Sequence, residues 1–290
     1  MEAFSYVAAT SVDEAVSVLN ENGDRARALS GGTDLLVALR EGRLSADVIV
    51  DVKGIAEVSE MTYDPANGLT LGASVPCHRM YDDEAVAAAY PGLMDSAHLI
   101  GGVQIQGRAS MGGNLCNASP AADAIPALIA HRAICNIAGP NGRRTMAIED
   151  FCLAPGRNAL ERGEFLVSMS VPAPQAGFGG AYLRFIPRNE MDIAVVGSGV
   201  AIQLDESRQT FVSARISLAA VAPRPLFVKE AGDALAGQPV NAESIAAAAD
   251  LAKAAARPIS DMRGPAEYRK HLSGVITRRA LEMAVERAQS

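Results

Sequence analysis

Two pairs of adjacent glycines, each flanked by hydroxyl or amide side chains, are the residues of this sequence best suited to chemistry. The first pair is Gly31-Gly32 and the second is Gly112-Gly113. A diphosphate carries two negative charges and needs many backbone N–H donors close to it. Glycine allows that approach because it has no Cβ. Together the two motifs indicate two halves of one pyrophosphate-binding site.

The side chains beside each glycine pair are types that hydrogen-bond phosphate oxygens. Ser30 and Thr33 flank the first pair, and Ser110 and Asn114 flank the second. Taken alone, either motif is also typical of a tight turn before a helix, with Thr33 or Asp34 as the cap of the first helix. The presence of both motifs in one chain favours phosphate binding.

Other nucleotide-binding signatures are missing from the sequence. Gly197-Ser198-Gly199 lies in an apolar, strand-like run, and Ile202 stands where a Rossmann fingerprint has its third glycine. Neither a Walker loop nor a G-x-S-x-G elbow occurs. These observations exclude P-loop NTPases and typical α/β-hydrolases.

Composition narrows the class of protein further. The 290 residues are 49% hydrophobic and carry a formal net charge of -7, so a sizeable core is expected and a nucleic-acid partner is not. No stretch reaches the roughly 18 apolar residues of a membrane span, and residues 1–9 do not resemble a signal peptide. We expect a soluble, cytoplasmic protein.

The cysteines and histidines show no pattern of a metal site. They are Cys77, Cys116, Cys135 and Cys152, with His78, His98, His131 and His271. No C-x-x-C pair occurs, and no histidine has zinc-ligand spacing. We therefore expect structural thiols, no metal and no iron–sulfur cluster on this chain, and no catalytic histidine.

Turn and helix signals divide the chain into three segments. Residues 1–55 read as a small α/β unit: Ser11 and Glu14 form a capping box before a helix that stops at Gly23, and then come a strand, a glycine turn, a helix and a strand. The later elements of this unit are expected at 25–29, 35–39 and 47–52.

Residues 56–175 and 176–290 have different patterns. The middle segment predicts strands at 57–63 and 69–73, joined as a hairpin by residues 64–68, and a second hairpin turning at Asn141-Gly142. It also predicts a strand at 165–171 and helices at 81–89, 91–99 and 121–130. The last segment follows a Pro- and Gly-rich linker. It predicts strands at 181–186, 193–204 and 211–222 and helices at 242–256 and 265–288, which is typical of an α+β domain.

The glycine motifs resemble the two FAD-binding motifs of the medium, flavin-carrying subunit of molybdenum hydroxylases, the family of carbon monoxide dehydrogenase and xanthine dehydrogenase. The resemblance spans nearly the whole chain. It is carried by Ser30–Leu36, Ser110–Asn114, Ser119–Asp123, Arg188–Val196, Pro258–Gly264 and Tyr268-Arg269. It implies an α+β fold, with a two-part FAD-binding region of the vanillyl-alcohol-oxidase (PCMH) type and a C-terminal domain of the CO dehydrogenase flavoprotein type.

The resemblance also implies which residues bind FAD. One side of the diphosphate would be wrapped by Leu29, Ser30, Gly31, Gly32, Thr33, Asp34 and Leu35, and the other by Ser110, Gly112, Gly113 and Asn114, with Ser119 nearby. Asp123 would accept a hydrogen bond from an FAD hydroxyl, on a ribose. Ile100 would lie against the flavin ring, or be an ordinary core isoleucine. Asp192 and Ile193 would approach the isoalloxazine.

The implied function is electron transfer within a larger assembly. The chain would carry FAD, a large subunit the molybdenum cofactor and a small subunit two [2Fe-2S] clusters, in a dimer of heterotrimers. FAD carries the chemistry, so the chain needs no catalytic acid, base or nucleophile. Two alternatives stay open: a self-sufficient FAD-dependent oxidase or reductase, and a scaffold that has lost its flavin. The substrate and the electron acceptor are not determined by this sequence.

Overall fold

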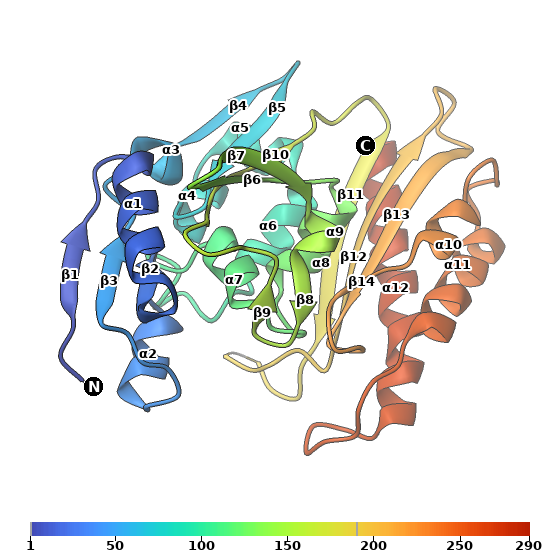
Figure 1. The fold of residues 1–290 in the computed structure, drawn as a ribbon. Coiled ribbons are helices and arrows are strands. Elements are labelled where there is room, and N and C mark those ends of the chain that lie inside the picture. Colours follow the sequence, from blue (N-terminus) through green and yellow to red (C-terminus); the bar gives the residue numbers. More distant parts are fainter. Residues whose placement is uncertain (1, 190) are drawn as a thin grey trace.

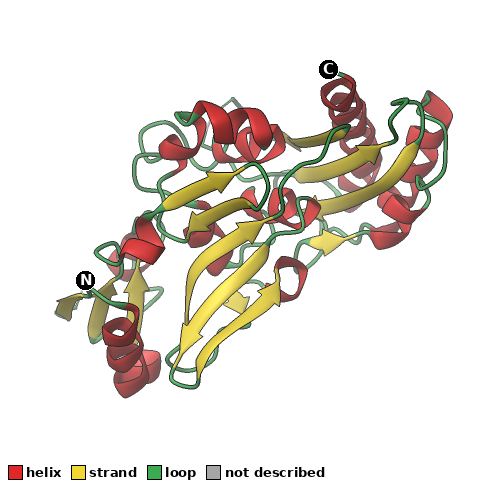
Figure 2. Cartoon of the chain, turned by 90° about the horizontal axis from the view of Figure 1, so that it is seen from above, coloured by secondary structure: helices red, strands yellow, loops and turns green. Residues whose placement is uncertain are grey.

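The computed structural model describes residues 2–189 and 191–290 and folds them into three units that follow one another along the chain (Figure 1). Glu190, part of the segment Arg188–Val196 on which the family resemblance partly rests, lies outside the described residues. Helices and strands are mixed throughout, as Figure 2 shows, and the expected α+β class is confirmed.

The first unit is a three-stranded parallel sheet with the strand order β1-β3-β2. Its elements are β1 (Ser5–Ala8), α1 (Val12–Asn22), the short 3-10 helix η1 (Gly23–Arg25), β2 (Ala26–Leu29), α2 (Leu35–Arg40) and β3 (Val48–Asp51). Because β2 and β3 run in the same direction, the residues that follow them emerge at one edge of the sheet. That edge carries Gly31-Gly32 and Lys53.

The start of α1 follows the predicted capping box with one change. The Ser11 side chain accepts a hydrogen bond from the Glu14 N–H at 3.2 Å. The Glu14 carboxylate reaches back to the N–H of Thr10 at 2.8 Å, one residue before the cap itself. One donor that the helix start leaves unpaired is thereby satisfied, together with the N–H of the residue before the cap.

The second unit is a five-stranded antiparallel sheet with the order β4-β5-β10-β6-β7, and both predicted hairpins are confirmed. Its strands are β4 (Met61–Asp64), β5 (Gly68–Gly72), β6 (Ile134–Gly139), β7 (Gly142–Ala147) and β10 (Phe165–Val171), with a small ribbon of β8 (Cys152–Ala154) and β9 (Arg157–Asn158). Its helices are α3 (Ala56–Ser59), α4 (Cys77–Tyr81), α5 (Glu84–Ala89), α6 (Pro91–Ala97), α7 (Met111–Asn117), α8 (Ala124–Ala130) and α9 (Ile148–Phe151).

Three expected elements of this unit differ from the structure. The strand predicted at 57–63 begins only at Met61, because the preceding residues form the turn α3, which buries Val58. The helix predicted at 81–89 is interrupted because the Asp83 carboxylate caps a new helix, accepting from the N–H groups of Ala85 and Val86. The helix predicted at 121–130 begins at Ala124.

The third unit is a four-stranded antiparallel sheet between two layers of helices (Figure 1). Its elements are β11 (Phe178–Phe185), β12 (Val196–Leu204), β13 (Phe211–Ala219), β14 (Leu226–Phe227), α10 (Lys229–Asp233), α11 (Ala242–Ala255) and α12 (Ala266–Gln289). The helix α12 packs on β11 and β12, while α6 and α8 of the second unit also contact this sheet. A Cβ at Gly199 would overlap the Pro126 carbonyl of α8, so that glycine serves close packing.

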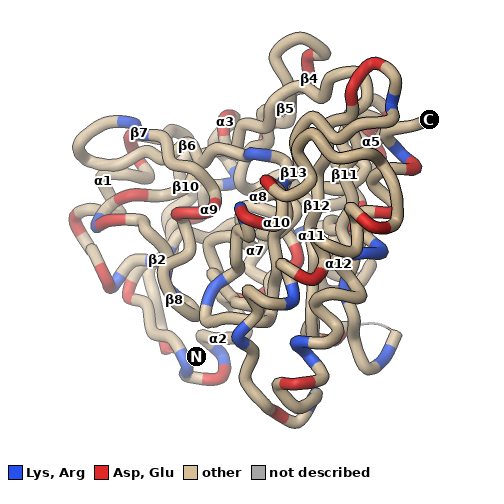
Figure 3. Tube along the Cα trace, turned by 90° about the vertical axis from the view of Figure 1, so that its right-hand side faces the viewer, with Lys and Arg blue, Asp and Glu red and all other residues tan. Residues whose placement is uncertain are grey.

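Buried apolar side chains form one core that runs through the first two units and a second core within the third. A small third cluster in the first unit consists of Leu29, Leu39, Ala46 and Ile49. Acidic and basic segments are interspersed along the trace in Figure 3. Among the helices of the described residues, none has the length and apolarity needed to cross a bilayer.

Candidate functional site

The two glycine motifs, far apart in the sequence, touch in the structure. The hydroxyl oxygens of Ser30 and Ser110 lie 3.2 Å apart. The Nε–H of Arg108 donates to the Gly31 carbonyl at 2.8 Å, and a Cβ at Gly31 would overlap the Arg108 carbonyl oxygen. Gly31 is therefore needed where the two chain segments cross, and the segments form one continuous surface.

The first motif presents a row of backbone donors. Within residues 2–189 and 191–290, the N–H groups from Gly31 to Asp34 make no hydrogen bond to a protein acceptor. Asp34 stands at the N-cap position of α2, but its side chain makes no capping bond. The capping bond that the simpler alternative assigns to Asp34 is therefore not formed. Consecutive N–H donors without protein partners fit an anionic group.

The second motif forms the first turn of α7 rather than a turn before it. Ser110 caps that helix, because its hydroxyl accepts from the Gly113 N–H at 3.0 Å. A Cβ at Gly112 would overlap the backbone of Ala73, whereas a Cβ at Gly113 would meet only the Ser110 hydroxyl, at 3.0 Å. Gly112 is thus required for packing against the protein, and Gly113 leaves its outer side open.

Asn114, the next residue of the motif, links the two helices of this region. Its side-chain oxygen accepts from the Ala124 N–H at 3.0 Å, which ties α7 to the start of α8. Ser119 lies in the intervening turn, where its hydroxyl accepts from the Ala121 N–H at 3.3 Å. The structure therefore places both residues beside Asp123, although it engages their side chains with backbone groups of the protein.

Lys53 is a residue of this region that sequence reasoning missed. Its ammonium group donates to the Ser30 carbonyl at 3.1 Å and to the Asp51 carboxylate at 2.6 Å. It adds a positive charge directly beside the row of N–H donors. The available signal was topological: Lys53 follows β3, and parallel strands bring their carboxyl ends to one edge of a sheet.

Asp123 is the buried carboxylate of the site, with only 6% of its surface exposed. The Tyr182 hydroxyl donates to its Oδ1 at 2.7 Å, and the Arg184 guanidinium donates to its Oδ2 at 2.8 Å. Burial raises the pKa of Asp123 to about 6, although Arg184 and the Tyr182 hydroxyl both oppose that shift. Each carboxylate oxygen retains lone-pair capacity for a further hydrogen bond.

Tyr182 and Arg184 also escaped the sequence analysis. They are two residues apart on β11, so both side chains point to the same face of the strand. Sequence alone did not indicate that this face of the C-terminal unit meets Asp123 of the FAD-binding region. The sequence shows that side chains alternate along this strand, but it does not show that one face of the strand contacts Asp123.

Ile100, Asp192 and Ile193 lie on two loops that contact each other. A Cβ at Gly102 would lie 2.8 Å from the Met191 sulfur, so the loop after Ile100 touches the segment that leads to Asp192. Ile100 is 6% exposed and packs in the core, whereas Ile193 is 53% exposed. The carboxylate of Asp192 lies 3.5 Å from both the Arg188 and the Arg263 guanidinium.

The remaining residues of the first motif pack around the glycines. Leu29 is buried at the end of β2, and Leu35 packs partly buried against the same small cluster. Both leucines therefore support the turn with their side chains, while Thr33 is half-buried beside it. Any contact of these residues with FAD would come from their backbone or, at Thr33, from a hydroxyl.

The cysteine thiols are in the reduced form, and burial raises the pKa of each. Such thiols are poor nucleophiles and poor metal ligands. Within the described residues, no three side chains of the metal-binding types gather into a group that could hold an ion.

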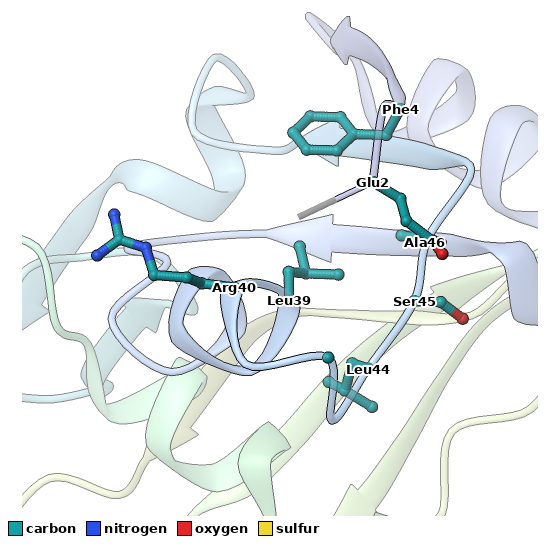
Figure 4. Close-up of a pocket in the computed structure, with 8 residues that line it drawn as sticks. Glu2, Phe4, Leu39, Arg40, Leu44, Ser45 and Ala46 are labelled. Carbon is teal, nitrogen blue, oxygen red and sulfur yellow. The ribbon is translucent and has the colours of Figure 1, made fainter.

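A separate hollow lies at the other end of the first unit (Figure 4). Phe4 and Leu39 face it, together with Leu44 and Ser45, and the last two lie in the loop before β3. Because Gly31-Gly32 follow the opposite end of the neighbouring strand β2, this hollow is not part of the glycine site.

The fold and site together define a protein with a two-part region for an anionic dinucleotide and an added α+β unit. Residues 2–174 match the family described as the FAD binding domain in molybdopterin dehydrogenase. Residues 181–284 match the CO dehydrogenase flavoprotein C-terminal domain. The chain therefore belongs to the FAD-binding proteins of the molybdopterin dehydrogenases, and the family predicted from the glycine motifs is confirmed.

Individual relatives agree over almost the full length. The chain is 32% identical to the carbon monoxide dehydrogenase medium chain of Afipia carboxidovorans, over 99% of this chain and 98% of that protein. It is 29% identical to the xanthine dehydrogenase FAD-binding subunit of Escherichia coli O157:H7, over 98% and 97%. The solved structure of reconstituted CO dehydrogenase from Oligotropha carboxidovorans matches with a TM-score of 0.93 and 31% identity, covering 99% of both chains.

Proposed function

We propose that this chain is the FAD-carrying electron-transfer subunit of a heteromeric molybdenum hydroxylase. Its FAD would take electrons from the [2Fe-2S] clusters of a small subunit and pass them to an external acceptor. A large subunit would carry the molybdenum cofactor and oxidise the substrate. The observation that carries this proposal is the contact of the two glycine motifs, which builds one anion-binding surface in a chain of the molybdopterin dehydrogenase family.

The residues present fit FAD on three counts. The N–H groups of residues 31–34 have no protein acceptor in the described chain, and the Lys53 ammonium lies beside them. Gly113 leaves the facing side open. Asp123 supplies a buried carboxylate for a hydroxyl. We assign the diphosphate to Ser30–Leu35 and Ser110–Asn114, a ribose hydroxyl to Asp123, and the flavin ring to the neighbourhood of Ile100, Asp192 and Ile193.

The protein's own part in the chemistry is to bind and orient. FAD, when bound, supplies the oxidation and reduction chemistry. The backbone N–H groups and Lys53 would neutralise the diphosphate charge, and Asp123 would fix one end of the cofactor. A self-sufficient oxidase would need its own catalytic acid or base, whereas the residues assigned to this site serve to bind FAD. The arrangement therefore favours an electron carrier over a self-sufficient oxidase.

The names of the relatives support the proposal that this chain has partner subunits, but they do not identify the substrate. One relative is a medium chain and another an FAD-binding subunit, and their enzymes are named for carbon monoxide and for xanthine. Both match this chain over nearly its full length, so its fold does not determine the substrate. We propose a large and a small partner subunit in a dimer of heterotrimers. The cytoplasmic location expected from the sequence stays a prediction.

Purification of the chain, alone and from its host, tests this function. Produced alone, it should be yellow, with about one FAD per chain, and free of iron and molybdenum. From its host, an affinity-tagged chain should bring down one larger, molybdenum-containing subunit and one smaller, iron-containing subunit. Substrate turnover by the isolated chain would favour the self-sufficient oxidase instead, and a colourless protein that takes up no added FAD would favour the scaffold.

A further inference from the structure

Tyr182 belongs to the C-terminal unit, but its hydroxyl ends on a carboxylate of the FAD-binding region. The O–H donates to Asp123 Oδ1 at 2.7 Å, and only 1% of the tyrosine surface is exposed. No polar partner other than Asp123 is bonded to that hydroxyl within the described residues. The orientation of the carboxylate is therefore coupled to the position of β11.

An ion pair between the helices α6 and α12 fixes β11 at this point. The guanidinium of Arg287, near the end of α12, makes two hydrogen bonds to the Asp95 carboxylate of α6, at 2.6 and 2.9 Å. The same carboxylate accepts from the Tyr182 N–H at 3.0 Å, and Arg287 also donates to the Gly180 carbonyl at 2.8 Å. Two-point pairing of this kind restricts geometry as well as adding energy.

These contacts form a connected path from the C-terminal helix to the FAD-binding region. The path runs from Arg287 to Asp95, then to the Tyr182 backbone, and through the Tyr182 hydroxyl to Asp123. Every link is a hydrogen bond between groups that are buried or partly buried. A shift of α12 would therefore move the donor that holds Asp123.

We propose that Tyr182 is a positioning residue for FAD, whose hydroxyl holds the Asp123 carboxylate in the orientation that accepts an FAD hydroxyl, and that the Asp95–Arg287 pair sets the position of Tyr182. The inference rests on the proposed function, because it takes Asp123 as the acceptor. It makes FAD affinity depend on how the C-terminal unit is docked.

The charged groups around Asp123 determine how the loss of the Tyr182 hydroxyl would change the pH dependence of FAD binding. Arg184 faces Asp123 from β11, and beyond it Arg188 and Arg263 flank Asp192. The Tyr182 hydroxyl and Arg184 both lower the pKa of Asp123 against the effect of burial. Loss of the hydroxyl therefore raises that pKa further, so the carboxylate becomes protonated at a higher pH.

The test is a titration of the full apoprotein with FAD, followed by fluorescence from pH 5 to pH 8. For Tyr182→Phe we expect FAD binding about tenfold weaker at pH 7.5, since the hydrogen bond lost is one to a charged group. We also expect the pH midpoint of binding to move upward. The matched control Tyr63→Phe, on β4, should bind FAD as the wild type does. A role in folding alone would not move the pH midpoint.

The ion pair offers a second variant that leaves Tyr182 in place. Arg287→Ala should weaken FAD binding about threefold or more, and Arg287→Lys should recover part of the loss because it keeps one charged donor. Arg278→Ala is the control on the same helix, because Arg278 is half-exposed and makes only a loose ion pair with Glu282, at 3.9 Å. Melting temperatures of all variants separate FAD affinity from stability.

Asp123→Asn separates failure of this inference from failure of the proposed function. If Asp123→Asn weakens FAD binding while Tyr182→Phe keeps the wild-type affinity and pH midpoint, Tyr182 is not a positioning residue and the proposed site stands. If Asp123→Asn itself binds FAD normally, the role assigned to Asp123 is wrong. Should Tyr182→Phe not fold, an unchanged affinity and midpoint in Arg287→Ala would overturn the inference.

Discussion

The side-chain oxygens of Ser30 and Ser110 lie 3.2 Å apart although 80 positions separate the two residues in the sequence. This contact joins a turn of the parallel unit to the first turn of a helix in the antiparallel unit. The two segments therefore form one continuous surface. The proposed binding site therefore depends on how the two units pack.

The two glycines of the second motif should fail in different ways. Gly112→Ala should lower the free energy of unfolding by about 1–3 kcal/mol, because the new methyl group overlaps the Ala73 backbone. Gly113→Val should fold but lose FAD, because its side chain points to the open side where the diphosphate is proposed. Thermal melts and FAD content per chain, measured on both variants, distinguish the two effects. Full FAD occupancy in folded Gly113→Val would refute the assignment of this loop.

Lys53 should contribute to FAD affinity through its charge. Lys53→Gln removes the ammonium group that holds the Ser30 carbonyl, so we expect FAD binding to weaken about tenfold and to depend less on salt. Titration of the apoprotein at low and at high ionic strength measures both effects. Lys229→Gln is the control, because Lys229 pairs with Asp233 on an exposed helix of the third unit. An unchanged salt dependence in Lys53→Gln would contradict the role given to the lysine.

FAD retention should depend on pH through Asp123. When Asp123 is ionised, either carboxylate oxygen can accept a hydrogen bond from a hydroxyl group. The pKa of about 6 means that protonation of Asp123 begins just below neutral pH. Affinity should therefore be full above pH 7 and fall as the pH drops through 6. Equilibrium dialysis between pH 5 and pH 8 measures this change. Asp123→Asn should bind more weakly at pH 7.5 and show no decline near pH 6.

His131 should make the folded state sensitive to acid. Burial lowers the pKa of His131 to about 4, and its Nδ1 lies 2.8 Å from the Ala127 carbonyl. Because this value lies below the usual 6.5, the unfolded chain takes up the proton first as the pH falls. Stability is then lost between pH 6.5 and pH 4, by about 3 kcal/mol.

Urea unfolding of wild type and His131→Gln at several pH values checks this prediction. The difference in unfolding free energy between the two proteins should change across that pH window, since only the wild type carries the titrating group. Parallel curves from pH 7 to pH 4 would show that His131 does not titrate as its burial requires.

The glycine motifs were recognisable from local chemistry, while their contacts with FAD stay a prediction. The sequence predicts bare backbone at Gly31 and Gly112 for the approach of a diphosphate, whereas in the structure a Cβ at either position would overlap another segment of the chain itself. The capping box of α1 and the two hairpins follow from short-range patterns of the same kind. Helical spacing of apolar residues placed α1, and Ala-rich composition placed α11 and α12.

The residues that were missed depend on contacts between units. Lys53 matters only because β2 and β3 are parallel, and Tyr182 and Arg184 matter only because β11 docks beside Asp123. Nothing in the local sequence of β11 indicates that partner. The interrupted helix at Asp83 is different, because aspartate is a preferred helix N-cap and the signal for a new helix is therefore local.

A structure of this chain with FAD bound tests the central claim most directly. The account predicts that the diphosphate lies between the two glycine motifs, with hydrogen bonds from N–H groups of residues 31–34 on one side and from the first turn of α7 on the other. A diphosphate that contacts only one motif, or that lies elsewhere on the chain, would contradict it.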